Sequence, residues 1–118
     1  WFGLRGRSAV LGLPGNPASA LVAARLFLKP AIEQLLGMNS DDGFLIARAA
    51  KSIGANGPRE TFLRARVTED AEGVRRVAPI DMQDSSLLSV MVQSNALIRR
   101  DIAASATPQG ELVEYLPI

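Results

Sequence analysis

The stretch Leu11–Leu21 (LGLPGNPASAL) organises the chain, because it predicts a strand end, a tight loop and a helix start in succession. Pro14-Gly15 is a turn dipeptide, and we expect Gly15 either to adopt a positive φ or to let a ligand approach the backbone. Asn16 is a favourable N-cap, and Pro17 suits the first helical position because its missing N–H has no partner to lose there.

The same loop has the features of a small anion-binding site. The backbone N–H groups of Ala18 and Ser19 are expected to point out of the helix start, where the helix dipole favours a negative group, and the Ser19 hydroxyl adds a donor. Many capped helices bind nothing, so a plain turn and cap is the alternative. The turn Arg5–Ser8 carries two more cations, Arg5 and Arg7, that either face an anion or are only solvated.

Composition excludes several classes of protein. The 118 residues include no Cys and no His, which removes disulfides, thiol catalysis, zinc fingers and His metal sites. A bound metal is then expected to be a hard cation such as Mg²⁺ on oxygen ligands. The net charge of +1 argues against nucleic-acid or membrane-surface binding, and Arg25 and Lys29 interrupt the apolar runs too often for a transmembrane helix. We expect a cytoplasmic protein.

The kind of element that the sequence predicts changes at a polar, turn-rich segment, Asn39–Gly43, which we take as the domain boundary. Before it we expect one or two short strands within residues 1–13 and a helix over Pro17–Leu36, kinked or restarted at Pro30 and capped by Gly37. This helix is apolar nearly all round, which implies burial on both sides, either in a layered α/β domain or at a subunit interface.

Beyond this segment, short apolar runs alternate with turn signals. Thr61–Thr68 is the clearest strand, with Leu63, Ala65 and Val67 on one face. The other expected elements are strands at Phe44–Ala50, Val74–Ile80, Asn95–Arg100 and Leu112–Leu116, a hairpin loop at Glu69–Gly73 and a short helix at Ser85–Gln93. Such a series of short strands predicts a small closed or half-open barrel. The fold class is α+β, with a strand–loop–helix piece in residues 1–40 and a mostly antiparallel barrel in residues 41–118.

Two further places suit an anion. Arg64 lies on the strand face opposite the apolar one, which is expected to leave its guanidinium outside the barrel core, and its forked donors match phosphate or another oxyanion. Ser85 and Ser86 begin the predicted helix and offer hydroxyl and N–H donors. The alternatives are a solvated Arg64 paired with Glu60 or Glu69, and a plain N-cap at Ser85.

Several of these stretches together resemble the MoeA/gephyrin family of molybdopterin molybdenumtransferases. The matching stretches are Phe2–Gly6, Gly12–Ala20, Leu26–Pro30, Leu35–Gly37, Gly57–Ala65 (GPRETFLRA) and Gln83–Ser89 (QDSSLLS). The chain departs from the family pattern at Asp84 and Ser86, where Gly is common, and at Arg99-Arg100-Asp101, where an apolar strand end and Pro are usual. The added carboxylate of Asp84 weakens a pure anion site but is a ligand of the kind that Mg²⁺ takes.

The resemblance implies that the chain is a fragment. Residues 1–40 would be the C-terminal part of a MogA-like α/β domain and residues 41–118 the family's C-terminal β-barrel, with catalytic acidic residues and a lysine-containing loop upstream. The resemblance further implies a homodimeric transferase that uses Mg²⁺ to insert molybdate into molybdopterin-AMP. No catalytic residue or metal ligand is assigned within the fragment. The implied substrate-binding residues are Pro14, Gly15, Asn16, Pro17, Ser19, Arg64 and Ser85.

Three other functions remain open. A molybdopterin adenylyltransferase shares the α/β domain and a similar loop, but it lacks the barrel predicted after residue 44. A gephyrin-like scaffold that clusters receptors requires a long linker and a further domain, neither of which these residues show. A phosphate-binding fragment without catalysis of its own also fits the isolated chain. Among partners, the resemblance implies the adenylyltransferase and molybdoenzymes, and no nucleic acid or membrane.

Overall fold

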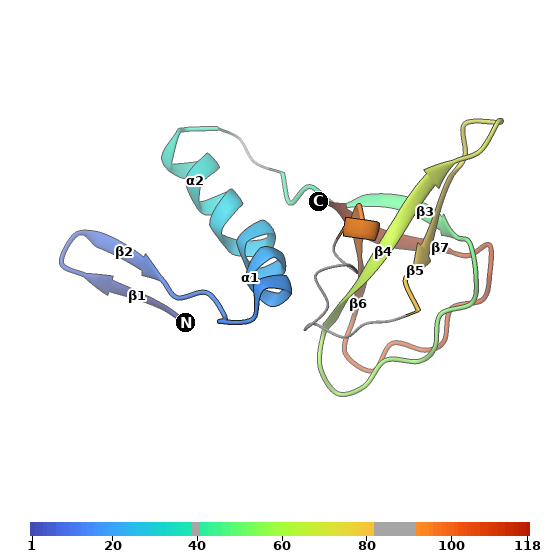
Figure 1. Cartoon of the computed structure of the whole chain (residues 1–118), viewed down its shortest axis with the longest axis horizontal. Helices are drawn as coiled ribbons and strands as arrows, with labels where there is room; N and C mark the ends of the chain where they lie inside the picture. Colours follow the sequence, from blue (N-terminus) through green and yellow to red (C-terminus); the bar gives the residue numbers. More distant parts are fainter. Residues whose placement is uncertain (39–40, 82–91) are drawn as a thin grey trace. The chain divides into compact units, whose positions relative to one another are not determined.

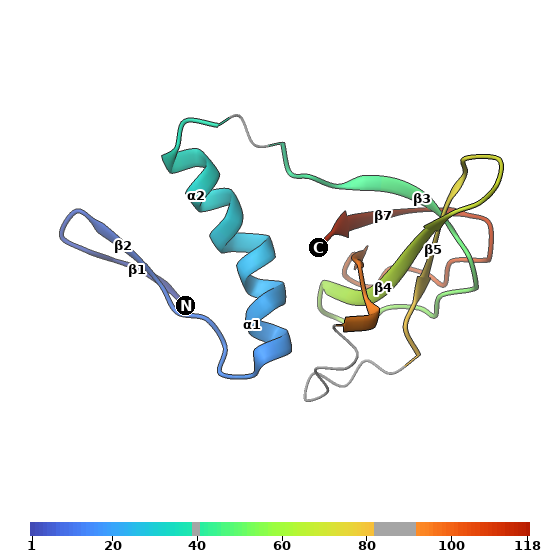
Figure 2. The ribbon, with the colours of Figure 1, turned by 45° about the horizontal axis from the view of Figure 1, so that its top comes forward.

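A computed structural model describes residues 1–38, 41–81 and 92–118 of the chain. The described residues fall into two compact units, the first within residues 1–42 and the second from Gly43 onward. A hairpin and a helix form the first unit, and a small barrel forms the second (Figures 1 and 2). Gly43 has a φ of +71°, a conformation that glycine adopts without the steric penalty of a Cβ.

The first unit begins with an antiparallel hairpin of β1 (Phe2–Arg5) and β2 (Ser8–Leu11), which confirms the short strands predicted there. Gly6, with a φ of +61°, makes the turn between them. The ladder is extended beyond the strands, because the Trp1 amino group donates to the Gly12 carbonyl (3.0 Å) and the Gly12 N–H donates to the Trp1 carbonyl (2.7 Å). The Trp1 indole covers Gly12 so closely that a Cβ there would lie 2.2 Å from its Nε1 atom.

A continuous helical segment follows the loop. It comprises α1 (Pro17–Ala23), the π-helical η1 (Ala24–Leu28) and α2 (Lys29–Leu35). The predicted disturbance at Pro30 takes the form of this π turn, in which the Lys29 N–H donates to the Ala24 carbonyl five residues earlier. The wider turn immediately before Pro30 thus accommodates a residue that has no N–H to donate. Gly37, with a φ of +72°, follows the helix end as predicted.

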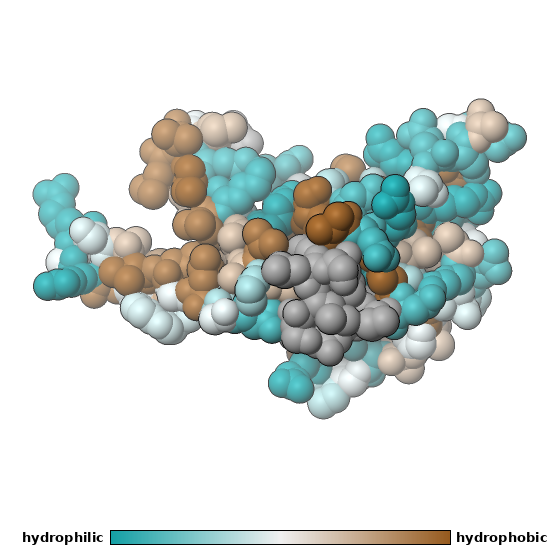
Figure 3. All heavy atoms as spheres, viewed as in Figure 1, coloured by the Kyte–Doolittle hydropathy of each residue, from teal (hydrophilic) through white to brown (hydrophobic). Residues whose placement is uncertain are grey.

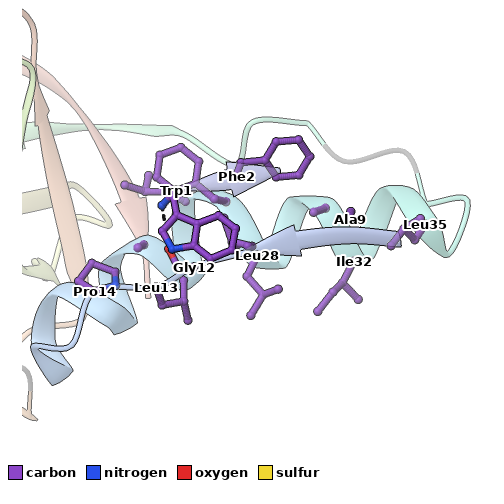
Figure 4. A pocket seen from close by; sticks show the side chains of 14 residues that line it. Trp1, Phe2, Ala9, Gly12, Leu13, Pro14, Leu28, Ile32 and Leu35 are labelled. Carbon is purple, nitrogen blue, oxygen red and sulfur yellow. Dashed lines mark hydrogen bonds between the residues drawn. The ribbon is translucent and has the colours of Figure 1, made fainter. Parts of the chain in front are cut away.

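The helix is not buried on both sides within this chain. The side chains of Phe27 and Leu35 are 60% and 85% exposed, because a hairpin of two strands is too small to enclose a helix that is apolar all round. Figure 3 shows the apolar surface that results on the hairpin and the helix. Within the described residues, no helix combines the length and the apolar character that a membrane span requires.

The second unit is a closed five-stranded barrel in the order β3-β5-β4-β6-β7. Its strands are β3 (Leu45–Ala49), β4 (Thr61–Glu69), β5 (Arg75–Pro79), β6 (Ala96–Arg100) and β7 (Leu112–Pro117). The predicted small, mostly antiparallel barrel is therefore confirmed. Among the described strands, β3 and β5 are the one parallel pair, and they close the barrel through two paired positions, Arg48 with Arg76 and Ala49 with Val77. The helix predicted at Ser85–Gln93 lies for the most part outside the described residues.

The barrel core is built largely from small side chains, which suit the narrow interior of a five-stranded barrel. The buried cluster consists of Ala47, Ala49, Ile53, Ala65, Val77, Ala96, Ile98, Val113 and Tyr115, with Leu63 and Val67 packed against it. The row Leu63, Ala65 and Val67 thus faces inward, as its alternation predicts.

The β4–β5 hairpin loop is organised by Asp70. Its Oδ1 atom accepts the N–H of Val74 (2.9 Å) and its Oδ2 atom accepts the Nε–H of Arg76 (2.9 Å). The Val74 N–H, with help from Arg76, holds the pKa of the Asp70 carboxyl below its usual value. Gly73, with a φ of +77°, completes the turn that the sequence predicts at this position.

Candidate anion-binding site

Asn16 caps the helix as predicted. Its backbone is extended (φ −75°, ψ 125°), and its Oδ1 atom accepts the N–H groups of Ala18 (3.0 Å) and Ser19 (3.2 Å). The Ala20 N–H donates to the Asn16 carbonyl (2.8 Å), and Pro17 has no N–H. The prediction that Ala18 and Ser19 present free N–H groups to an anion is therefore wrong, because the cap uses both of them. Of the donors predicted at the start of this helix, the Ser19 hydroxyl remains for an anion.

The φ of Gly15 lies outside the left-handed region, so of the two expectations for this glycine only a close approach by a ligand is left. The chain turns instead through the extended Asn16, a conformation favoured for a residue that precedes proline. A Cβ placed on Gly15 would have no heavy atom within 4 Å, and Pro14 and Pro17 on either side of Gly15 and Asn16 are exposed. The loop therefore has open space at Gly15 for a ligand to approach its backbone.

Arg64 lies on the outward row of β4, opposite the core, but it is not solvated. It is 7% exposed, and in the β4–β6–β7 register it aligns with Leu97 and Leu116, which are 0% and 1% exposed. The alternative of a solvated Arg64 is thus wrong, because this part of the barrel is buried on both of its faces. Arg64 is not a member of the core cluster, as its place on the row opposite Leu63 and Ala65 predicts. Glu69, weighed as a surface partner for Arg64, pairs with Arg75 at 3.7 Å.

Glu60, the other carboxylate weighed as a partner for Arg64, belongs to a surface network around Arg99. The Arg99 Nε atom donates to Glu60 (2.7 Å), and the guanidinium also lies near Asp101 (3.4 Å) and Glu114 (3.7 Å) and over the Phe44 ring (5.4 Å to its centroid). The hydrogen bond to Glu60 and the neighbouring carboxylates raise the pKa of Arg99 above its usual value. This arginine is a surface pairing residue.

The neighbouring Arg100 has a structural role. It is 7% exposed and donates to the Thr107 hydroxyl (2.6 Å) and to the carbonyls of Gly54 (3.1 Å) and Ser105. The side chain therefore joins the segment after β3 to the segment after β6. The resemblance predicted an apolar residue at this strand end, and this contact between loops, rather than an anion site, accounts for the arginine found there.

Of the other predicted positions, Ser85 and Asp84 lie outside the described residues. The motif around Arg64 contains a second arginine, Arg59, which the sequence analysis did not select. Arg59 is exposed, and its carbonyl accepts hydrogen bonds from Asn56 Nδ2 (2.8 Å) and Thr61 Oγ1 (3.2 Å), so its backbone is anchored.

The described residues contain no cluster of metal-ligating side chains. Nowhere among residues 1–38, 41–81 and 92–118 do three or more Asp, Glu, His or Cys side chains gather closely enough to hold an ion. Arg5 and Arg7 are exposed on and beside the turn of the first hairpin. The loop Pro14–Ser19 belongs to the first unit and Arg64 to the second.

Comparison with curated proteins gives a consistent group of relatives. The chain is 28% identical over 120 residues to molybdopterin molybdenumtransferase 1 of Mycobacterium tuberculosis, covering 96% of this chain and 28% of the relative. It is 30% identical over 111 residues to molybdopterin molybdenumtransferase of Bacillus subtilis, covering 92% of this chain and 25% of the relative. The chain thus spans about a quarter of the length of these relatives.

Solved structures share the fold. Two crystal structures of molybdopterin biosynthesis moeA protein from Pyrococcus horikoshii match with TM-scores of 0.70 and 0.78, at 25% and 23% identity. They cover 88% and 98% of this chain, and 26% and 28% of the solved chains. The family model of the MoeA C-terminal region (domain IV) matches residues 46–118, which include the whole barrel apart from the first residue of β3. The chain therefore belongs to the MoeA family and contains its C-terminal domain IV.

Proposed function

We propose that this chain is part of a molybdopterin molybdenumtransferase that acts in molybdenum cofactor biosynthesis. In this proposal the full-length protein inserts molybdate into adenylylated molybdopterin, with Mg²⁺, and releases AMP. Family membership and the names of the relatives from Mycobacterium tuberculosis and Bacillus subtilis support it. We further propose that the protein works in the cytoplasm as a homodimer. In the biosynthetic sequence its step would follow that of the adenylyltransferase and precede the molybdoenzymes.

The observation that carries the proposal for this chain is the buried position of Arg64. A guanidinium offers five N–H donors in a planar fork that matches a phosphate or a tetrahedral oxyanion. Arg64 projects from the middle of β4 in a row with the fully buried Leu97, so the strand and its neighbours hold the base of the side chain. Such a preorganised cation favours an anion without reordering when the anion arrives.

The loop Pro14–Ser19 would bind the anionic end of the pterin substrate. Because the Asn16 cap uses the N–H groups of the first turn, the donors we assign are the Ser19 hydroxyl and the exposed backbone at Gly15. Ser85 is kept as a proposed second contact of the anion. No group of three or more acidic side chains gathers among the described residues, and we assign no ligand of Mg²⁺ to them.

Arg64 is tested by measuring molybdenum insertion with the full-length dimer. If Arg64 contacts the anion, Arg64→Ala should lose about 2–4 kcal/mol of transition-state stabilisation, roughly a 30- to 1000-fold loss of rate. Arg64→Lys should restore only part of it, because a point charge does not replace the fork. Arg66→Ala is the matched control, since Arg66 is an exposed arginine on the same strand whose guanidinium donates to the Gln93 carbonyl.

Arg64 is buried, so each variant is first compared with the wild type by thermal unfolding. A folded Arg64→Ala protein that inserts molybdenum at the wild-type rate would contradict the proposed role.

The loop is tested by titrating molybdopterin onto the full-length dimer and following fluorescence. Ser19→Ala should weaken binding while leaving the helix intact, since Ala is the better helix former. Gly15→Val should abolish binding by filling the space that the ligand needs. Because Gly15 has no positive φ and a Cβ on it would have no neighbour within 4 Å, this variant should fold normally. If both variants bind molybdopterin with wild-type affinity, the loop is only a turn and does not bind the substrate.

A further inference from the structure

Backbone hydrogen bonds join two loops of the barrel near Asn56. The Asn56 N–H donates to the Ala104 carbonyl (2.8 Å), and the Ala103 N–H donates to the Gly57 carbonyl (2.9 Å). These bonds join the segment between β3 and β4 to the segment between β6 and β7, and we call the joined region the loop clasp. The peptide groups on both sides of the Asn56–Gly57 bond are therefore held in place.

The Asn56 side chain lies at the centre of the loop clasp. Its Nδ2 atom donates to the carbonyls of Arg59 (2.8 Å), Arg100 (3.0 Å) and Asp101 (2.7 Å), while its Oδ1 atom accepts the Thr61 hydroxyl (3.0 Å). All three partners of the nitrogen are acceptors, so this position requires a hydrogen-bond donor. A carboxylate here would have its unprotonated oxygen facing three carbonyl oxygens.

Asn56 is followed by Gly57, the neighbour that least hinders attack by its own backbone nitrogen. In that reaction the Gly57 nitrogen gives up its proton and bonds to the Asn56 side-chain carbon, and the amide nitrogen takes up a proton and leaves as ammonia. The resulting succinimide takes up water and opens to an aspartyl or an isoaspartyl residue. We propose that Asn56 is a deamidation site that the loop clasp protects, and that its conversion to an acid opens the clasp.

The other described asparagines are less suited to this reaction. Asn16 precedes Pro17, whose nitrogen carries no hydrogen, and Asn95 precedes Ala96, whose side chain hinders the attack. Gly57 itself is not required by the fold: it has no positive φ, and a Cβ placed on it would have no neighbour within 4 Å. Gly57→Ala therefore removes the unhindered nucleophile while leaving the clasp in place.

The test compares deamidation of the whole chain in its folded state and in urea, at mildly alkaline pH, by peptide mass spectrometry. In urea, Asn56 should convert faster than Asn95, and Gly57→Ala should slow the conversion at Asn56. In the folded chain, Asn56 should convert at least about tenfold more slowly than in urea, because the clasp must open before the attack. Equal rates at Asn56 in the two states would overturn the protection, and a rate in urea no greater than that of Asn95 would overturn the site.

A second arm tests the consequence of deamidation. Asn56→Asp, which imitates the product, should lower the unfolding temperature, whereas Gln109→Glu should leave it unchanged, because Gln109 is an exposed amide. An Asn56→Asp chain as stable as the wild type would overturn the claim that the acid opens the clasp. The rate measurements use the wild-type chain and do not depend on whether this variant folds.

Discussion

Arg99 and Arg100 are adjacent arginines of one strand, and the structure predicts opposite results when each is replaced by alanine. Arg100 is 7% exposed, whereas the Arg99 side chain is 37% exposed. Arg100→Ala removes two buried methylenes, about 1.6 kcal/mol, and charge-assisted hydrogen bonds that together contribute about 1.5–3 kcal/mol. We expect a loss of about 3–5 kcal/mol, which lowers the unfolding temperature of a domain this size by on the order of 15–30 °C.

The assay is thermal unfolding followed by far-ultraviolet circular dichroism. The near-ultraviolet signal of Tyr115, the single tyrosine and a 2% exposed member of the core, reports on the barrel. Arg99→Ala should melt close to the wild type, and its small effect should shrink further in salt, because exposed ion pairs are weak and screened. If Arg100→Ala is no less stable than Arg99→Ala, the conclusion that Arg100 holds two loops together is wrong.

Three further results are expected. Asn16→Ala should cost about 0.5–2 kcal/mol in urea unfolding, since two N–H groups lose their cap, and an unchanged midpoint would contradict the cap. Asp70→Asn should be less stable than the wild type near neutral pH because it loses the charge that pairs with Arg76. Because the pKa of Asp70 is lowered in the folded chain, this difference should begin to shrink as the pH falls toward the usual value of 3.8 and be lost once the pH falls through the lowered pKa, and a constant difference would refute it. Calorimetry should detect no tight, stoichiometric binding of Zn²⁺, given the absence of His and Cys, and its detection would refute the expectation that a metal bound here is a hard cation on oxygen ligands.

Many local features of this protein follow from neighbouring residues alone. Asn16 before Pro17 predicts the helix cap, and the alternation of Leu63, Ala65 and Val67 predicts which row of β4 faces the core. The ends of all five barrel strands lie within one residue of the predicted ends, because turn residues such as Gly73 end the strands at definite positions. These features depend on dihedral preferences and on periodicity, which act over a few residues.

The properties that matter for the site depend on residues distant in the chain. Nothing local distinguishes Arg64, which is buried beside Leu97, from Arg66, which is exposed two residues later. The parallel pairing of β3 with β5 closes the barrel between strands that are not consecutive in sequence. Burial and strand pairing depend on which residues the whole fold places beside each position. The alternation of apolar and polar residues along one strand does not show which residues those are.

The anion site shows the same limit at short range. The sequence marked the loop correctly as a capped turn, but the cap and an anion compete for the same N–H groups of Ala18 and Ser19. Only the coordinates decide that Asn16 takes both, at 3.0 and 3.2 Å. The sequence by itself therefore determined the elements, the barrel class and the family resemblance. The tertiary structure decided which donors are used, which arginines are buried and which loops are joined, because each of these depends on distances between atoms that the order of residues does not specify.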